Sequence, residues 1–243
     1  MSAPAALALP ARQSFVWPVT IPIATGVAGS RLGTPAAHIR KAQGETLFSE
    51  GDVTNSIYEI LQGMVRLVKL LPDGRRQITG FLTAGHLLGL APEGVNVFTA
   101  EAVTEVTLCR YGRAAFEHMI DEVPGFAKRL VDVASHELRA AQDQMLLLGR
   151  KTATEKVASF ILTLARQQAK AAGQEIELPM SRSDIADYLG LTIETVSRTI
   201  TKLRQDELIS LPAPTRLTIR DGRRLQELAA GDLDQGLQKR RRA

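Results

Sequence analysis

Three polar side chains in the segment 181–203 have the chemistry needed to read nucleic-acid bases. Glu194, Ser197 and Arg198 lie at positions i, i+3 and i+4, which places them on one face of a helix. Arginine can donate two hydrogen bonds to O6 and N7 of guanine, glutamate can accept one from N4 of cytosine, and serine can contact a base edge. The packing residues fall on the opposite face, and they are Val196, Ile200 and Leu203. We therefore predict that the polar set reads bases.

Neighbouring polar residues suit contacts to the DNA backbone rather than to bases. Such contacts position a protein on the duplex without specifying sequence. The predicted phosphate contacts are Arg182, Thr192, Thr195 and Lys202.

These side chains require two short helices joined by a tight turn. Ser183 is expected to cap the first helix, Gly190 to allow the turn and Thr192 to cap the second helix. This is the helix-turn-helix pattern. The alternative is an all-α domain that binds no nucleic acid, with Glu194 and Arg198 forming an ordinary surface ion pair. A predicted β-hairpin follows, formed by Leu208–Leu211, Pro-Ala-Pro-Thr and Arg216–Arg220, and it favours a winged helix-turn-helix.

Charge is unevenly spread along the 243 residues. Residues 150–243 hold 17 Lys and Arg against 12 Asp and Glu, whereas residues 1–149 hold 13 against 14. A basic half indicates a polyanionic partner, although the run Lys239–Arg242 could simply be a solvated tail. The chain has no apolar run of about 18 residues, so no membrane span is expected. It also lacks a basic start before Arg12 and has one cysteine, so we predict a cytoplasmic protein.

A heptad stripe in residues 126–148 predicts self-association through a long helix. Its apolar positions alternate spacings of four and three, as in helices that pair with a copy of themselves. The predicted dimer-interface residues are Val131, Ala134, Leu138, Ala141, Met145 and Leu148, with Ala127 opening the stripe. The alternative is that this helix only covers its own domain. A second apolar row could serve that purpose, formed by Phe126, Leu130, Val133 and Leu147.

The first half of the chain reads as short strands separated by glycines. The expected strands are Ser56–Gln62, Met64–Leu71, Gln77–Phe81 and Val103–Arg110. The sequence Leu71-Pro-Asp-Gly74 is typical of a turn between two of them. Many short strands with glycine turns predict a small barrel or sandwich. The chain is therefore of the α+β class.

The segment Leu178–Arg198 resembles the DNA-reading part of the CRP/FNR transcription regulators, and Glu-x-x-Ser-Arg resembles their FNR and FixK branch. Gly44–Asp52, Gly63-Met-Val-Arg-Leu and Asp73–Phe81 are similar to the β-roll of that family. The resemblance implies an N-terminal β-roll (a cyclic-nucleotide-binding-like jelly roll), a long dimerisation helix and a C-terminal winged helix-turn-helix. The expected divisions are a flexible arm at 1–30, the β-roll at 31–115, the dimerisation helix region at 116–149, the DNA-binding domain at 150–230 and a basic tail at 231–243.

The resemblance also implies a homodimer on a palindromic TTGA…TCAA site and contacts with RNA polymerase. The matching polymerase-contact positions are about Asp73–Arg76, with Asp73, Arg75 and Arg76 as candidates, and about Lys170–Glu175. These regulators activate transcription, so the chain is expected to be an activator.

The sequence departs from the family at the positions that bind cofactors or effectors in other members. FNR holds an iron–sulfur cluster with several cysteines, whereas this chain has only Cys109. Its cyclic-nucleotide relatives bind phosphate with an arginine, whereas no Lys or Arg lies between Gly85 and Arg110. The four histidines show no metal spacing. We therefore expect no cofactor and no metal, as in FixK.

Enzyme motifs are absent from the sequence, so catalytic residues are not expected. Two alternative functions remain open. One is an effector-gated regulator with an unrecognised ligand, for example haem, in the β-roll. The other is a scaffold that uses the heptad helix for a partner and binds no DNA.

Overall fold

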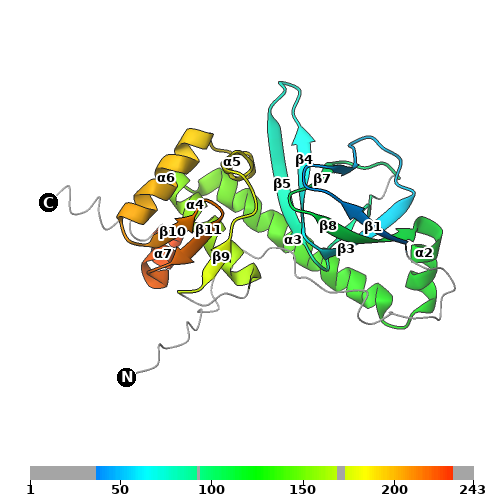
Figure 1. The fold of residues 1–243 in the computed structure, drawn as a ribbon. Coiled ribbons are helices and arrows are strands. Elements are labelled where there is room, and N and C mark those ends of the chain that lie inside the picture. The colour runs from blue at the N-terminus through cyan, green and yellow to red at the C-terminus, as the bar shows by residue number, and fades with distance from the viewer. Residues whose placement is uncertain (1–36, 92–93, 169–172, 232–243) are drawn as a thin grey trace. The chain divides into compact units, whose positions relative to one another are not determined.

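The computed structural model describes residues 37–91, 94–168 and 173–231. These residues form two compact units, and the boundary between the units falls inside helix α3 (Phe126–Arg150), after Leu138. Figure 1 labels the elements of both units. The arm expected at 1–30 lies outside the described residues, as does the tail expected at 231–243 apart from Gly231.

The first unit is the expected β-roll, built from two antiparallel sheets. One sheet has the order β1 (Ala37–Lys41), β8 (Val106–Gly112), β3 (Ser56–Gln62), β6 (Leu87–Leu88). The other has the order β2 (Thr46–Phe48), β7 (Thr99–Ala102), β4 (Met64–Leu70), β5 (Arg76–Thr83). Alternate residues of both sheets point inward and form one core, which contains Ile60, Val65, Leu82, Leu88, Ala100, Ala102, Val106 and Leu108.

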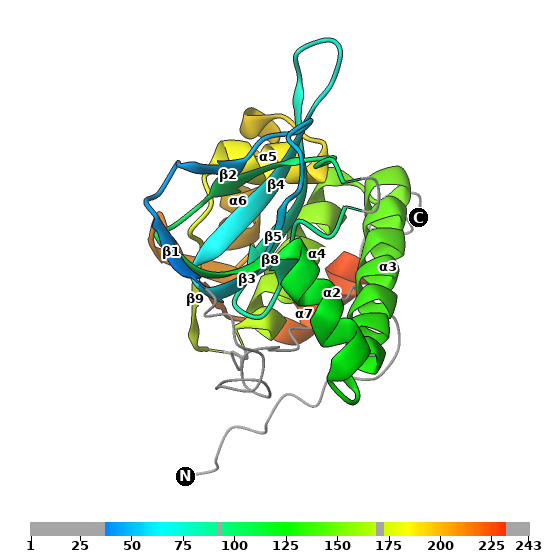
Figure 2. The same cartoon turned by 90° about the vertical axis from the view of Figure 1, so that its right-hand side faces the viewer.

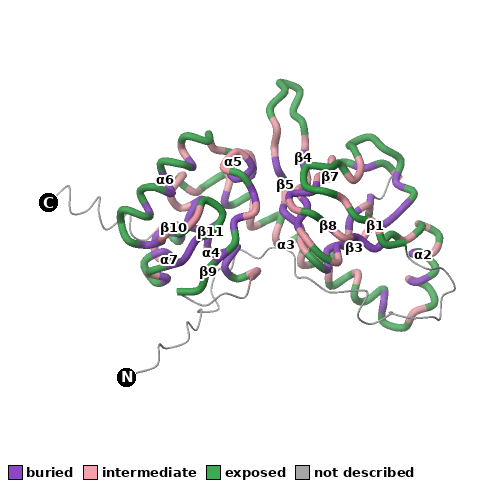
Figure 3. The backbone as a smooth tube through the Cα atoms, viewed as in Figure 1, coloured by how far each residue is buried: buried purple, intermediate pink, exposed green. Residues whose placement is uncertain are grey.

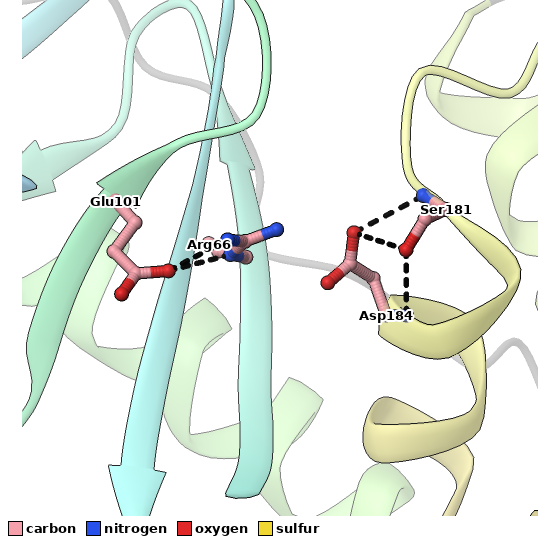
Figure 4. A network of polar contacts seen from close by, with 4 residues as sticks. All are labelled: Arg66, Glu101, Ser181 and Asp184. Carbon is pink, nitrogen blue, oxygen red and sulfur yellow. Dashed lines mark hydrogen bonds and ion pairs between the residues drawn. The ribbon is translucent and has the colours of Figure 1, made fainter. Parts of the chain in front are cut away.

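An ion pair ties two neighbouring strands of the second sheet. Nε and Nη2 of Arg66 on β4 approach Oε2 of Glu101 on β7 at 2.8 and 2.7 Å (Figure 4). The two residues are opposite each other in the register, so the pair supports the alignment of the strands.

The expected strand over 103–110 is wrong at its start, because β8 begins three residues later. The amide of Val103 donates to the carbonyl of Met64 at 2.8 Å, so the chain turns there instead of extending. Gly63 lies under this turn with φ of 91°, and a Cβ atom there would lie 2.2 Å from the carbonyl oxygen of Glu105. Only glycine satisfies both conditions.

Helix α2 (Arg113–Glu122) and the start of α3 cover the outer face of the first sheet. Phe116 and Phe126 meet edge to face, with ring centroids 5.5 Å apart. They form a second cluster with Ile57 and Met119. This packing anchors the first turns of α3 to the β-roll (Figure 2).

Helix α3 separates its two apolar rows as the heptad analysis supposed. Phe126 and Leu147 of the second row are buried. The heptad stripe stays on the surface of the single chain, with Val131 63%, Leu138 62% and Met145 71% exposed. Most of α3 is coloured as exposed or half-buried in Figure 3. Such exposure of large aliphatic side chains along one row is unusual for a surface without a partner.

In its described residues, the second unit contains the end of α3, four further helices and a three-stranded sheet. Its elements after α3 are α4 (Ala153–Gln167), β9 (Glu175–Glu177), α5 (Arg182–Leu189), α6 (Ile193–Gln205), β10 (Ile209–Ala213), β11 (Arg216–Ile219) and α7 (Gly222–Ala230). Helix α4 begins with the reciprocal hydrogen bonds of a capping box between Thr152 and Glu155, and it packs against α6 and α7. No helix in the described ranges is long and apolar enough to cross a membrane.

Candidate nucleic-acid interface

Helix α5 is capped by Ser181, so the cap expected at Ser183 is wrong. The hydroxyl of Ser181 accepts from the amide of Asp184 at 3.0 Å, and the amide of Ser181 donates to the Asp184 carboxylate at 3.1 Å (Figure 4). Ser183 lies two residues further along, inside α5, and the residue three positions after it is Ala186, which has no side-chain acceptor. The capping box therefore starts the helix two residues earlier.

Gly190 makes the turn between the two helices. Its φ and ψ of 60° and 46° are left-handed, as glycine allows at a helix C-terminus. The buried ammonium of Lys156 on α4 donates to the carbonyl of Leu189, at 3.2 Å. That lysine satisfies a carbonyl at the end of α5 and ties the turn to α4.

Helix α6 is capped as expected by Thr192, whose hydroxyl accepts from the amide of Thr195 at 3.2 Å. The packing face is buried, with Val196 and Leu203 at 0% exposure and Ile200 at 7%. The turn to α5 is tight enough for the amide of Leu191 to donate to the carbonyl of Ala186 at 3.0 Å. These contacts set which face of α6 is left outward.

The three predicted base-reading residues, Glu194, Ser197 and Arg198, are all exposed on the first two turns of α6. The pKa of Glu194 is held below its usual value by its own backbone amide, by the Thr192 hydroxyl and by the charge of Arg198. The carboxylate is therefore ionised at neutral pH and acts as an acceptor. A helix presenting a bidentate donor and an acceptor in this way has the requirements for major-groove readout.

The four predicted phosphate contacts surround this face unevenly. Thr192 and Lys202 are exposed, whereas Thr195 is half-buried and its hydroxyl lies 3.0 Å from that of Thr192. Arg182 is also half-buried, and its Nη2 donates to the carbonyl of Pro214 at 3.4 Å.

A groove beside α6 brings some of these residues together. Its walls are Arg182, Ser197, Ile200, Thr201, Arg204 and Leu211. The groove therefore joins the start of α5, one side of α6 and the hairpin that follows. Sequence reasoning placed Arg182 and Ser197 in separate roles and did not include Arg204.

The hairpin forms a wing whose turn is shorter than expected, while its second strand ends one residue earlier than expected, at Ile219. Strand β10 continues to Ala213, so only Pro214 and Thr215 make the turn before β11. Strand β9, which sequence analysis missed, pairs with β11, and Arg216 lies 3.1 Å from the Glu175 carboxylate across this pair. Three residues in β9 are too few for a strand signal in the sequence.

One exposed aliphatic residue also escaped the sequence analysis. Ile193, the first residue of α6, is 46% exposed beside Glu194. An apolar side chain exposed on a helix of this kind can contact a thymine methyl group in the major groove. The sequence could have indicated Ile193, because it directly follows the helix cap Thr192, at a position where the core does not need an apolar residue.

The polymerase-contact candidates lie on the hairpin between β4 and β5. The carboxylate of Asp73 accepts from the backbone amide of Arg75 at 3.0 Å and from its Nε at 2.7 Å, which lowers the pKa of Asp73. Arg76 begins β5. Of the second candidate segment, residues 170–172 lie outside the described residues and Glu175 belongs to β9.

Arg113 holds the loop that follows β6 in the β-roll. The carbonyls of Gly89 and Ala91 accept from Nη2 of Arg113 at 3.4 and 3.3 Å. Nε and Nη2 of that guanidinium also donate to Thr54, and Nη1 lies 3.9 Å from the Glu117 carboxylate. The sequence contains no Lys or Arg between Gly85 and Arg110.

Cys109 is buried in β8 opposite Glu59. Burial is the main cause that raises the pKa of its thiol, so the thiol is protonated at neutral pH. Within the described ranges, no three His, Cys, Asp or Glu residues are grouped so that they could hold a metal ion.

Comparisons with known proteins agree with this geometry. Residues 155–228 match the family model of the Crp-like helix-turn-helix domain, and residues 39–123 match that of the cyclic nucleotide-binding domain. The transcriptional activatory protein AadR of Rhodopseudomonas palustris is 47% identical over 197 residues, 80% of this chain and 82% of that protein. The nitrogen fixation regulation protein FixK of Bradyrhizobium diazoefficiens is 48% identical over 191 residues, 78% and 80% of the two chains.

Among solved structures, that of FixK2 from Bradyrhizobium japonicum superposes with a TM-score of 0.74 at 37% identity. It covers 79% of this chain and 96% of that chain. These relatives are transcription regulators, which agrees with the prediction that the chain is not an enzyme.

Proposed function

Because the chain belongs to the CRP/FNR family of transcription regulators and to its FixK-like branch, we propose that it is a homodimeric activator that binds a palindromic TTGA…TCAA site. It acts with neither an iron–sulfur cluster nor a cyclic nucleotide. Each subunit reads one half-site with α6.

The observation that carries this proposal is the outward face of α6. Glu194, Ser197 and Arg198 are exposed there together, while Val196 and Leu203 are fully buried. Arg198 is assigned to guanine and Glu194 to a cytosine on the other strand. Thr192, Thr195, Arg182 and Lys202 surround these side chains and are assigned to backbone phosphates.

The dimer forms through the exposed stripe of α3. A palindromic site requires two copies of α6 related by a two-fold axis, about one helical turn of DNA apart. The stripe supplies a self-complementary apolar surface, because the same residues from both copies meet at such an axis. The interface residues are Val131, Ala134, Leu138, Ala141, Met145 and Leu148, of which all but Leu148 are exposed in the single chain.

Two observations support independence from effectors. The chain lacks the cysteine ligands for a cluster, and the arginine beside the loop after β6 already has partners within the protein. An iron–sulfur cluster is typically held by four thiolates, whereas Cys109 is the only cysteine in the sequence and a dimer would supply two. A cyclic phosphate needs a free cation, whereas Arg113 is bonded to Thr54, Gly89 and Ala91. Asp73, Arg75 and Arg76 on the β4–β5 hairpin are assigned to RNA polymerase.

Footprinting tests this proposal directly. The protein is purified in air, without added iron or nucleotide, and titrated onto a duplex carrying TTGA…TCAA and onto a scrambled duplex of equal composition. We expect symmetric protection of the palindrome at concentrations that leave the scrambled duplex unprotected. Equal protection of both would contradict sequence-specific reading. A stoichiometric cofactor in the purified protein, whose removal abolishes protection, would instead support an effector-gated regulator.

A further inference from the structure

The two flanks of α6 differ in their surroundings. Successive residues of an α-helix are rotated by about 100° around its axis. Lys202 and Arg204 are two positions apart, so their side chains leave the helix in directions about 160° apart. Ser197, Thr201 and Arg204 share one flank, since they lie at i, i+4 and i+7. This flank faces the wing, and with Arg182 it lines the groove described above.

The groove holds two cations and no anion. Neither Arg182 nor Arg204 has a carboxylate within ion-pair distance in the described part of the chain, and the six lining residues contain none. Arg182 has only the long bond to the Pro214 carbonyl, and partial burial lowers its pKa without removing its charge. Two unpaired guanidinium groups beside the apolar walls Ile200 and Leu211 make the groove favourable for an anion.

Geometry identifies the source of that anion. The DNA major groove is about 12 Å wide, and a helix with its side chains is about 10–12 Å in diameter, so the flanks of an inserted helix face the two phosphate backbones. With Glu194 and Arg198 directed at the bases, the flank toward the wing meets one strand. The flank that carries Thr195 and Lys202 meets the other.

We propose that the groove between α6 and the wing is a binding site for a single phosphate of the DNA backbone, clamped by Arg182 and Arg204. The inference rests on the proposed function and adds Arg204, a residue outside the base-reading set. The clamp joins two helices through one phosphate and thereby fixes the rotation of α6 about its own axis. Thr201 lines the groove but is not a donor to the phosphate, because its hydroxyl donates to the carbonyl of Ser197 at 2.9 Å.

The test combines a charge-removing variant with charge-removing changes in the DNA. Wild type and Arg204→Ala are titrated with duplexes that carry one neutral methylphosphonate per half-site, moved one position at a time along each strand. We expect one position at which the methylphosphonate weakens wild-type binding but has no effect on Arg204→Ala. At every other phosphate contact, the methylphosphonate should reduce the DNA affinity of the two proteins by the same factor. Thr201→Ala, the control from the same groove, should behave as wild type at all positions.

Salt dependence provides a second readout. Loss of one phosphate contact lowers the slope of log affinity against log salt by about 0.9, or about 1.8 for both subunits of a dimer. Arg204→Ala and Lys202→Ala should both show this decrease in slope. For each variant there should be one methylphosphonate position that no longer affects binding, and the two positions should lie on opposite strands.

If Arg204→Ala and the methylphosphonates act independently at every position, the clamp is overturned while the proposed function stands. If wild type does not prefer the palindrome, both proposals fail. Circular dichroism and thermal unfolding of Arg204→Ala establish that the variant is folded.

Discussion

Arg113 holds Thr54 by two hydrogen bonds, one from Nε to the carbonyl oxygen at 3.0 Å and one from Nη2 to the hydroxyl at 3.1 Å. The two residues are 59 positions apart in the chain. Because Arg113 is the first residue of α2 and also bonds the carbonyls of Gly89 and Ala91, it joins a loop of the β-roll to the helix that packs against α3.

We expect Arg113→Met to lower the free energy of unfolding of the β-roll by about 1–3 kcal/mol. The methionine retains an apolar stem but leaves several carbonyl oxygens without their charged donor. Chemical denaturation followed by circular dichroism measures the change. Arg75→Met is the matched control, because the Arg75–Asp73 ion pair is exposed and such pairs contribute little. Equal stability of the two variants would contradict a structural role for Arg113.

Replacing Leu138 and Met145 by glutamate should separate the dimer. Both side chains are exposed on the α3 stripe, and at a two-fold axis each new carboxylate would meet its own copy. We expect the double variant to sediment as a monomer and to lose affinity for the palindrome. Arg129→Glu, an exposed change off the stripe, should stay dimeric. A double variant that remains a dimer with wild-type affinity would place the interface elsewhere.

Changing Asp73, Arg75 and Arg76 together to alanine should reduce transcription while leaving DNA affinity unchanged. The Asp73–Arg75 pair is exposed at the turn of the β4–β5 hairpin, so its loss should not disturb the core. Transcription in a purified system and binding titrations with the same protein measure the two effects. A parallel loss of both would refute the assignment to RNA polymerase.

Arg198→Ala should abolish the preference for guanine in the half-site. A bidentate arginine–guanine contact is worth about 1–3 kcal/mol, and a dimer loses it twice. Weak, salt-sensitive binding to any duplex should remain. Titrations against the native site and a guanine-substituted site measure the discrimination.

Lys202→Ala is the comparison for that experiment. If Lys202 contacts only phosphate, its removal should weaken binding to both duplexes by the same factor. Should Arg198→Ala still distinguish the two sites, α6 does not read the guanine through this residue.

Much of the molecule follows from patterns confined to one element. The helical period of Val196, Ile200 and Leu203 determined which side of α6 is buried and therefore left Glu194 and Arg198 outside. Thr192 began its helix where the sequence predicted, because an N-cap needs only a partner three residues away. The two apolar rows of α3 were separable for the same reason, since both repeat along a single helix.

The cap at Ser181 was likewise within reach of the sequence, because its partner Asp184 is three residues away and Ser183 has no such partner. Contacts between distant residues needed the tertiary structure. Strand β9 is three residues long and exists through its pairing with β11, about 40 residues later. The Arg113–Thr54 contact and the groove shared by Arg182 and Arg204 likewise arise from long-range packing. Periodicity records which face of an element is buried, but not which other element will cover or extend it.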